Sequence, residues 1–119
     1  MALVELPEHP DLPETPKQRG DRKDDQGKPL VIKGFLNYFP RAVIAVARIS
    51  EFGATKYEWN GFSAVENAVE RYAEAEIRHL LYEIIEGEGS CDKESELMHK
   101  AHKAWNAMAE LELFIREQS

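Results

Sequence analysis

The chain has 119 residues, of which 43% are hydrophobic and 31% are charged, and its formal net charge is −7 at pH 7. This length favours a single domain, and the composition is that of a globular protein rather than a disordered one. An acidic chain lacks the cationic surface on which non-specific binding to nucleic acid depends, so these numbers argue against a nucleic acid polymer as the partner.

The sequence also predicts where the protein works. Cys91 is the only cysteine, so no disulfide can form within the chain. No apolar run approaches the roughly 20 residues that a membrane-spanning helix needs. The first residues, "MALVELPEHPDLPETPKQRG", lack the basic flank and the long apolar core of a signal peptide. We therefore expect a cytoplasmic protein with no membrane partner.

Residues 1–30 differ in composition from the rest of the chain. They hold five of the six prolines and the mixed-charge run "KQRGDRKDDQGKP". Proline removes a backbone donor and stops helix continuation, which predicts an extended or irregular N-terminal arm over residues 1–30. Residues 31–119 are then the folded domain, and "PLVIKGFLNYF" near its start fits a short strand or an extended segment equally well.

A first helix is predicted from Pro40, because proline suits the first turn of a helix and "PRAVIAVARISEF" then continues to Gly53 without a breaker. Asn60 and Gly61 mark a turn after the helix ends.

The segment "GATKYEWNGF" carries the first candidate site. Lys56 offers a charge for phosphate, Tyr57 and Trp59 offer stacking surfaces for a base, and Asn60 can pair with a base edge. The alternative is an ordinary helix end, in which the lysine complements the helix dipole and the aromatic rings pack on the bundle.

A second helix is predicted to open at a capping box formed by Ser63 and Glu66 and to run to about Gly87. Its apolar side follows the helical period and comprises Val69, Ala73, Ile77, Leu80, Leu81, Ile84 and Ile85. Beside it runs a polar stripe at steps of three, four and three residues: Glu76, His79, Glu83 and Glu86.

A third helix is predicted after the interruption "GEGSCD", with Asp92 or Ser95 as its cap, and it extends to near the C-terminus. Its apolar side comprises Met98, Ala101, Ala104, Trp105, Met108, Leu111 and Ile115, and its polar stripe comprises His99, His102 and Asn106. The predicted fold class is therefore all-α, a helical bundle with two long antiparallel helices and a shorter one. Because each helix has a side to bury, we expect a homodimer or homotetramer to complete the bundle.

The two polar stripes line one cleft if the second and third helices pack antiparallel. Carboxylates and imidazoles together suit divalent metal ions: Mg²⁺ prefers the carboxylates, and imidazole favours softer ions such as Mn²⁺, Co²⁺ or Zn²⁺. The alternative is a solvated surface on which the glutamates pair with Arg71, Arg78 or Lys100. Spacing alone favours this alternative, because no motif here is a specific signature.

Five segments in a fixed order add to this evidence: "DDQGKP", "ISEFGATKY", "RHLL", "GEGSCDKES" and "HKAHKAWN". Together they resemble the phage and bacterial family of dATP/dGTP diphosphohydrolases, the MazZ-like group of the MazG-related all-α nucleoside triphosphate pyrophosphatases. The resemblance implies hydrolysis of dGTP, dATP or both to the monophosphate and pyrophosphate, with roughly two or three Mg²⁺ or Mn²⁺ ions. Such ions explain how an acidic protein holds an anionic substrate.

The resemblance and the stripes together nominate site residues. The expected catalytic residues are His79, His99 and His102. The expected metal ligands are Glu76, His79, Asp92, Glu94, His99 and His102. The expected substrate-binding residues are Lys56, Tyr57, Asn60, Arg78 and Asn106.

The metal-binding motif itself departs from the MazG pattern. MazG-type enzymes use Glu-x-x-Glu on one helix and Glu-x-x-Asp on the next. In this chain His99-x-x-His102 takes the second place, and Glu76-x-x-His79 or Glu83-x-x-Glu86 takes the first, so the choice of carboxylate ligands stays open. A non-catalytic helical module that binds a nucleotide or assembles with a protein is the alternative function.

Overall fold

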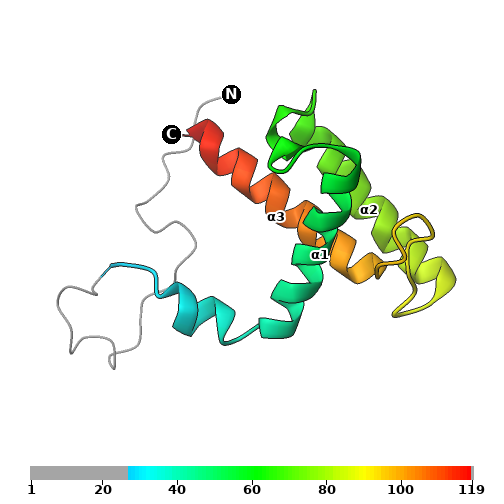
Figure 1. The fold of residues 1–119 in the computed structure, drawn as a ribbon, viewed down its shortest axis with the longest axis horizontal. Helices are drawn as coiled ribbons and strands as arrows, with labels where there is room; N and C mark the ends of the chain where they lie inside the picture. The colour runs from blue at the N-terminus through cyan, green and yellow to red at the C-terminus, as the bar shows by residue number, and fades with distance from the viewer. Residues whose placement is uncertain (1–26, 119) are drawn as a thin grey trace. The chain divides into compact units, whose positions relative to one another are not determined.

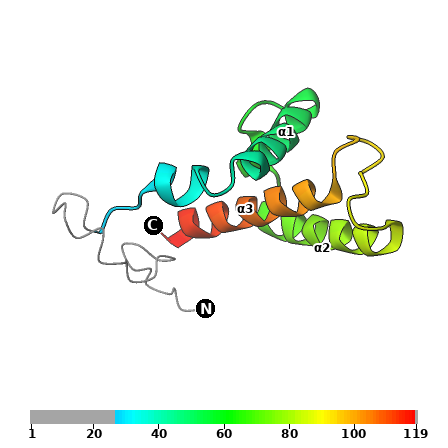
Figure 2. The same ribbon diagram turned by 90° about the horizontal axis from the view of Figure 1, so that it is seen from below.

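The computed structural model describes residues 27–118, so most of the predicted arm lies outside the described residues. Figure 1 and Figure 2 show the helical elements in chain order: η3 (Ile32–Leu36), α1 (Pro40–Lys56), η4 (Gly61–Ala64), α2 (Ala68–Glu86) and α3 (His99–Gln118). Over residues 27–118 there is no strand, only an isolated bridge between Cys91 and Met98. The predicted all-α fold class is thereby confirmed. No helix in this part of the chain is both long enough and apolar enough to cross a membrane.

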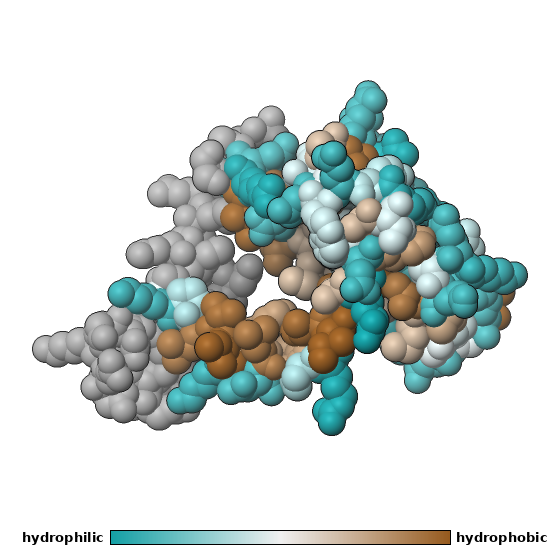
Figure 3. Space-filling view, viewed as in Figure 1, coloured by the Kyte–Doolittle hydropathy of each residue, from teal (hydrophilic) through white to brown (hydrophobic). Residues whose placement is uncertain are grey.

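The chain divides into two compact units, and the described residues up to Pro40 belong to the first. Here the segment predicted as strand or extended forms the π-helix η3, in which the Asn37 N–H donates to the Ile32 carbonyl at 2.8 Å. A strand needs a partner strand for its backbone groups, and local hydrogen bonds satisfy them instead. Figure 3 shows hydrophobic side chains exposed along η3, and these include Ile32 and Phe35.

The second unit, residues 41–117, carries the rest of the fold. Helix α1 begins at Pro40 as predicted but continues past Gly53 to Lys56. It packs on α3 through two contacts. The Trp105 Nε1–H donates to Ser50 Oγ at 2.8 Å, and the Phe52 ring meets the His102 ring edge-on. Ile49 is the buried residue of this helix.

The predicted start of α2 is wrong by about one turn. Asn60 and Asn67 both adopt left-handed backbone conformations, with φ of 64° and 56°. Asparagine tolerates this conformation, which interrupts a helix. Ser63 therefore lies in the 3₁₀ turn η4, and α2 begins only at Ala68. The end of α2 agrees with the prediction, because Gly87 follows its last residue with φ of 112°.

Helices α2 and α3 run antiparallel, and Figure 2 shows them alongside each other. Tyr72 near the start of α2 contacts Trp105, while Glu83 near its end pairs with Lys103 and Lys100 in the first turns of α3. The antiparallel pairing that the sequence predicted is present.

The apolar core of this unit is small. Among the described hydrophobic residues, Ile49, Ala101 and Ala109 are the buried ones. Ile84 and Ile85 on α2 expose 68% and 78% of their surface. Much of the predicted apolar side of α2 thus faces outward, and the polar stripe beside it faces α3.

Candidate metal and catalytic site

Three imidazoles meet where α2 packs against the first turns of α3. His79 Nδ1 lies 2.8 Å from His99 Nδ1, and the His79 and His102 rings stack at 4.3 Å between centroids with 8° between their planes. His99 and His102 expose only 2% and 7% of their surface. The pair is therefore not a solvated helix side.

The loop between α2 and α3 brings a carboxylate to these rings. The Asp92 N–H donates to the Leu97 carbonyl at 2.8 Å, and the Ser95 N–H donates to Asp92 Oδ2 at 2.9 Å. Asp92 and Ser95 were predicted as caps of α3, but they close this loop instead, and α3 begins at His99. Backbone hydrogen bonds within the loop thus hold Asp92 in place beside the histidines.

His79, Asp92 and His99 form a candidate metal-binding group. Each offers one ligand atom, and these atoms lie within 4.8 Å of one another. Two imidazole nitrogens and a carboxylate oxygen at this separation are a usual donor set for a divalent first-row metal ion. His102 lies beside the group, with its Nε2 at 3.9 Å from Asp92 Oδ2.

One nitrogen of each of these two α3 histidines also has a partner outside the ligand group. His99 Nε2 lies 3.1 Å from Glu86 Oε1, and His102 Nε2 lies 2.7 Å from Ser95 Oγ. Partners of this kind hold a ligating ring in one orientation. Neither Glu86 nor Ser95 was nominated as a site residue, although Glu86 follows His79 by seven residues on the predicted stripe.

The electrostatics of the group favour the forms that bind metal. Burial, assisted by the neighbouring His102, lowers the pKa of His79 from 6.5 to about 4, although Asp92 opposes this shift. Burial also lowers the pKa of His102. Burial works against ionisation of Asp92, but its hydrogen bonds from Ser95 lower its pKa overall. At neutral pH the two imidazoles are thus uncharged and the carboxylate is ionised, as metal ligands must be.

Glu83 links the two helices next to this group. It is buried, and its carboxylate lies 2.8 Å from Lys103 Nζ and 3.0 Å from Lys100 Nζ. Hydrogen bonds from Lys103 and then Lys100 lower the pKa of Glu83 to about 2. This charge is already matched by two lysines, which makes Glu83 a structural link rather than an open ligand.

The predicted phosphate and metal residues Lys56 and Glu94 pair with each other. Lys56 Nζ lies 3.1 Å from Glu94 Oε2 and 5.3 Å from the centre of the Phe52 ring. Because Phe52 also meets the His102 ring, this pair stands at the edge of the histidine group. The carboxylate of Glu94 is engaged by a lysine in this structure.

The remaining predicted substrate residues are spread over three places. Tyr57 and Asn60 are exposed in the segment between α1 and η4. Arg78 is exposed beside His79, and its charge contributes to the lowered pKa of that histidine. Asn106 is buried, and its Nδ2 donates to the His102 carbonyl at 2.8 Å. In this structure its amide group therefore bonds to the backbone of its own helix, α3.

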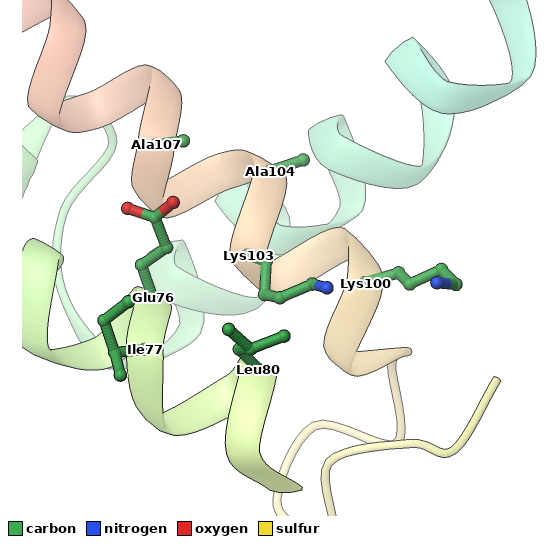
Figure 4. A pocket seen from close by; sticks show the side chains of 7 residues that line it. All are labelled: Glu76, Ile77, Leu80, Lys100, Lys103, Ala104 and Ala107. Carbon is green, nitrogen blue, oxygen red and sulfur yellow. The ribbon is translucent and has the colours of Figure 1, made fainter. Parts of the chain in front are cut away.

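Glu76 is not part of the histidine ligand group. Figure 4 shows Glu76 among the side chains that line a pocket between α2 and α3. The pocket has a volume of about 480 Å³, and its lining residues are Glu76, Ile77, Leu80, Lys100, Lys103, Ala104 and Ala107. Burial, followed by a hydrogen bond with Glu76, raises the pKa of Glu110 to about 7. The two carboxyls therefore form their own pair.

The fold and this ligand group define an all-α protein with a candidate divalent metal centre between antiparallel helices. A family model described as "dATP/dGTP diphosphohydrolase, N-terminal" matches residues 17–119, and the chain belongs to this family. The match confirms the family that the five segments resemble. No curated protein matches the chain, and no solved structure does.

Proposed function

We propose that the chain hydrolyses dATP, dGTP or both to the monophosphate and pyrophosphate in a metal-dependent reaction. The observation that carries the proposal is the group of His79, Asp92 and His99, whose ligand atoms lie within 4.8 Å of one another in a member of this family. The stacked His102 and the cation of Lys56 adjoin the group. A water molecule attacks the α-phosphorus, and pyrophosphate is the leaving group.

The donor set fits a resident Mn²⁺ or Mg²⁺ ion. Two imidazole nitrogens favour Mn²⁺, and carboxylate oxygens accept either ion. When bound, such ions neutralise phosphate charge and lower the pKa of water, and roughly two or three take part in the proposed reaction. We assign Glu94 as a candidate further ligand, and we give His102, which was also predicted as a ligand, the role of general base instead. Glu76 is not part of this proposal, because its carboxyl pairs with Glu110.

The chain's own cations bind the triphosphate in this scheme. Lys56 exchanges its Glu94 partner for a phosphate oxygen, and the exposed Arg78 provides a second donor. The exposed ring of Tyr57 and the amide of Asn60 receive the base. Asn106 stays a prediction as a substrate contact.

His102 takes the role of general base. Burial keeps its pKa below the ordinary value, so the ring is unprotonated at neutral pH. Ser95 Oγ lies 2.7 Å from His102 Nε2 and orients the ring, and the other ring nitrogen, Nδ1, accepts the proton of the attacking water while Nε2–H donates to Ser95 Oγ.

The test is release of pyrophosphate from dATP and dGTP with Mn²⁺ or Mg²⁺, compared with the other nucleoside triphosphates. Asp92→Asn should abolish the release, whereas Glu88→Gln, an exposed acid in the same loop, should leave it unchanged. No release from either substrate would overturn the proposal. Absence of Mn²⁺ binding as well would favour a non-catalytic module.

We also propose that the chain works as a homodimer or homotetramer in the cytoplasm. One copy buries little apolar surface, and the outward side of α2 exposes Ile77, Leu81, Ile84 and Ile85. A second copy is the fitting occupant, since acidic side chains on α2 and α3 would repel an anionic membrane. Light scattering should show a mass above that of one chain, and Ile84→Lys with Ile85→Lys should reduce it. A monomeric unsubstituted chain would contradict this.

A further inference from the structure

We propose that Glu86 is a positioning residue that selects the tautomer of His99 and so makes Nδ1, rather than Nε2, the metal-ligating atom of this histidine. The inference rests on the proposed function, because it concerns the same metal centre. It adds a residue that touches neither metal nor substrate and acts through His99.

The geometry places one partner at each nitrogen of a buried ring. Glu86 is the last residue of α2 and His99 is the first of α3. His99 Nε2 lies 3.1 Å from Glu86 Oε1, and His99 Nδ1 lies 2.8 Å from His79 Nδ1. With only 2% of its surface exposed, His99 has little access to water as an alternative partner.

The chemistry of the two partners decides which nitrogen carries hydrogen. A carboxylate only accepts hydrogen bonds, so the nitrogen that faces Glu86 must be N–H. An imidazole that binds a metal ion has a single N–H, which leaves the lone pair of His99 on Nδ1. That lone pair points to His79, which is a member of the same ligand group.

The same arrangement assigns the proton of the His79–His99 contact. If His99 Nδ1 has the lone pair, His79 Nδ1 must donate in the metal-free protein. If His79 also ligates through Nδ1, its hydrogen must move from Nδ1 to Nε2, with solvent as the carrier and no net change of charge, whereas ligation through His79 Nε2 needs no such movement. Glu86 spares His99 this rearrangement.

Glu86 itself does not belong to the ligand group. It contacts His99 through the nitrogen on the far side from His79, and the atoms that lie within 4.8 Å of one another come from His79, Asp92 and His99. Carboxylates that hold the second nitrogen of a ligating histidine fix the ring and raise its basicity. Their loss costs roughly 10- to 100-fold in metal affinity.

The experiment compares Glu86→Ala and Glu86→Gln with the unsubstituted chain and with Glu88→Gln. Glu88 is the matched control, since it is an exposed acid two residues away in the sequence. Nitrogen NMR shifts of the metal-free protein report the tautomer of His99, and calorimetric titration with Mn²⁺ reports metal affinity. Helical circular dichroism identifies any variant that fails to fold.

We expect Nε2–H on His99 in the unsubstituted chain and a mixture of tautomers in Glu86→Ala, with Mn²⁺ affinity reduced about 10- to 100-fold. Glu86→Gln should restore most of both, because an amide oxygen also accepts the Nε2–H. Glu88→Gln should match the unsubstituted chain.

Unchanged Mn²⁺ affinity and an unchanged tautomer in folded Glu86→Ala would overturn the inference. Absence of Mn²⁺ binding to the unsubstituted chain would overturn it together with the proposed metal centre. Weakened Mn²⁺ binding in Glu86→Ala, without pyrophosphate release by the unsubstituted chain, would support the inference and overturn only the proposed function.

Discussion

The histidine group and the segment after α1 are the two halves of the proposed site, and they are built differently. In the histidine group, His99 is almost fully buried and both its ring nitrogens have partners. In the segment after α1, Tyr57 exposes 66% of its surface, and Lys56, the last residue of α1, is held by one exposed carboxylate. The metal half is therefore organised before any ligand arrives, whereas the substrate half has side chains free to close around a nucleotide.

The largest expected effect on activity comes from removing a histidine of the metal half. His99→Ala removes a ligand from the proposed metal group, and loss of metal assistance worth several kcal/mol should lower pyrophosphate release on the order of 1,000-fold. Initial-rate assays at saturating Mn²⁺ measure it. His99 is buried, so circular dichroism must first show that the variant is folded. Near-normal turnover by the folded variant would place the metal centre elsewhere.

A smaller effect is expected from a change in the substrate half. Lys56→Ala removes a charged hydrogen bond to phosphate, which should lower kcat/KM about 10- to 100-fold, mainly through KM. Its thermal stability should hardly change, because the Lys56–Glu94 pair is exposed. Lys93→Ala is the matched control, an exposed lysine in the loop that carries Glu94. Equal kinetics for Lys56→Ala and Lys93→Ala would show that Lys56 does not bind the substrate.

Acid should lower the folding stability of the metal-free protein through His79 in the metal half. The unfolded chain protonates His79 near pH 6.5, but the folded chain does so only near pH 4, so the unfolded state binds more protons between these values. The melting temperature in the presence of a chelator should therefore fall as the pH drops from 7 toward 4. His79→Gln should flatten this dependence. The same slope in both proteins would show that His79 titrates normally.

The smallest effect concerns the acid pair beyond the histidines. The pKa of Glu110 is raised to about 7, so the folded chain binds more protons than the unfolded one between about pH 4.5 and 7, and stability from this group is lost as the pH rises. Glu110→Gln should raise the melting temperature at pH 8 relative to the unsubstituted chain and change it less at pH 5. A pH-independent effect would contradict the raised pKa.

The stripe pattern on α2 and α3 was predictable in detail. The spacing of His79, Glu83 and Glu86 placed them on one side of a helix, and the structure turns that side toward α3. The start of α2 was not predictable in the same way. Ser63 and Glu66 fit a capping box, but two asparagines in left-handed conformations interrupt the chain there. The capping box and the asparagine turns were local signals of similar strength. Tertiary contacts, such as the Tyr72 hydroxyl that donates to the Phe62 carbonyl, favour the turns.

The sequence by itself determined the helical class, the antiparallel order of α2 and α3 and the family, because periodicity, breakers and ordered segments are local properties of the chain. Only the tertiary structure decided which polar residues share the site. It placed Asp92 beside the histidines and Glu76 beside Glu110. It also paired Glu86 with His99 and Glu94 with Lys56. The reason is physical: helical spacing sets the side on which a carboxylate lies, but the pairing of helices and the closing of a loop set which charge or ring it meets.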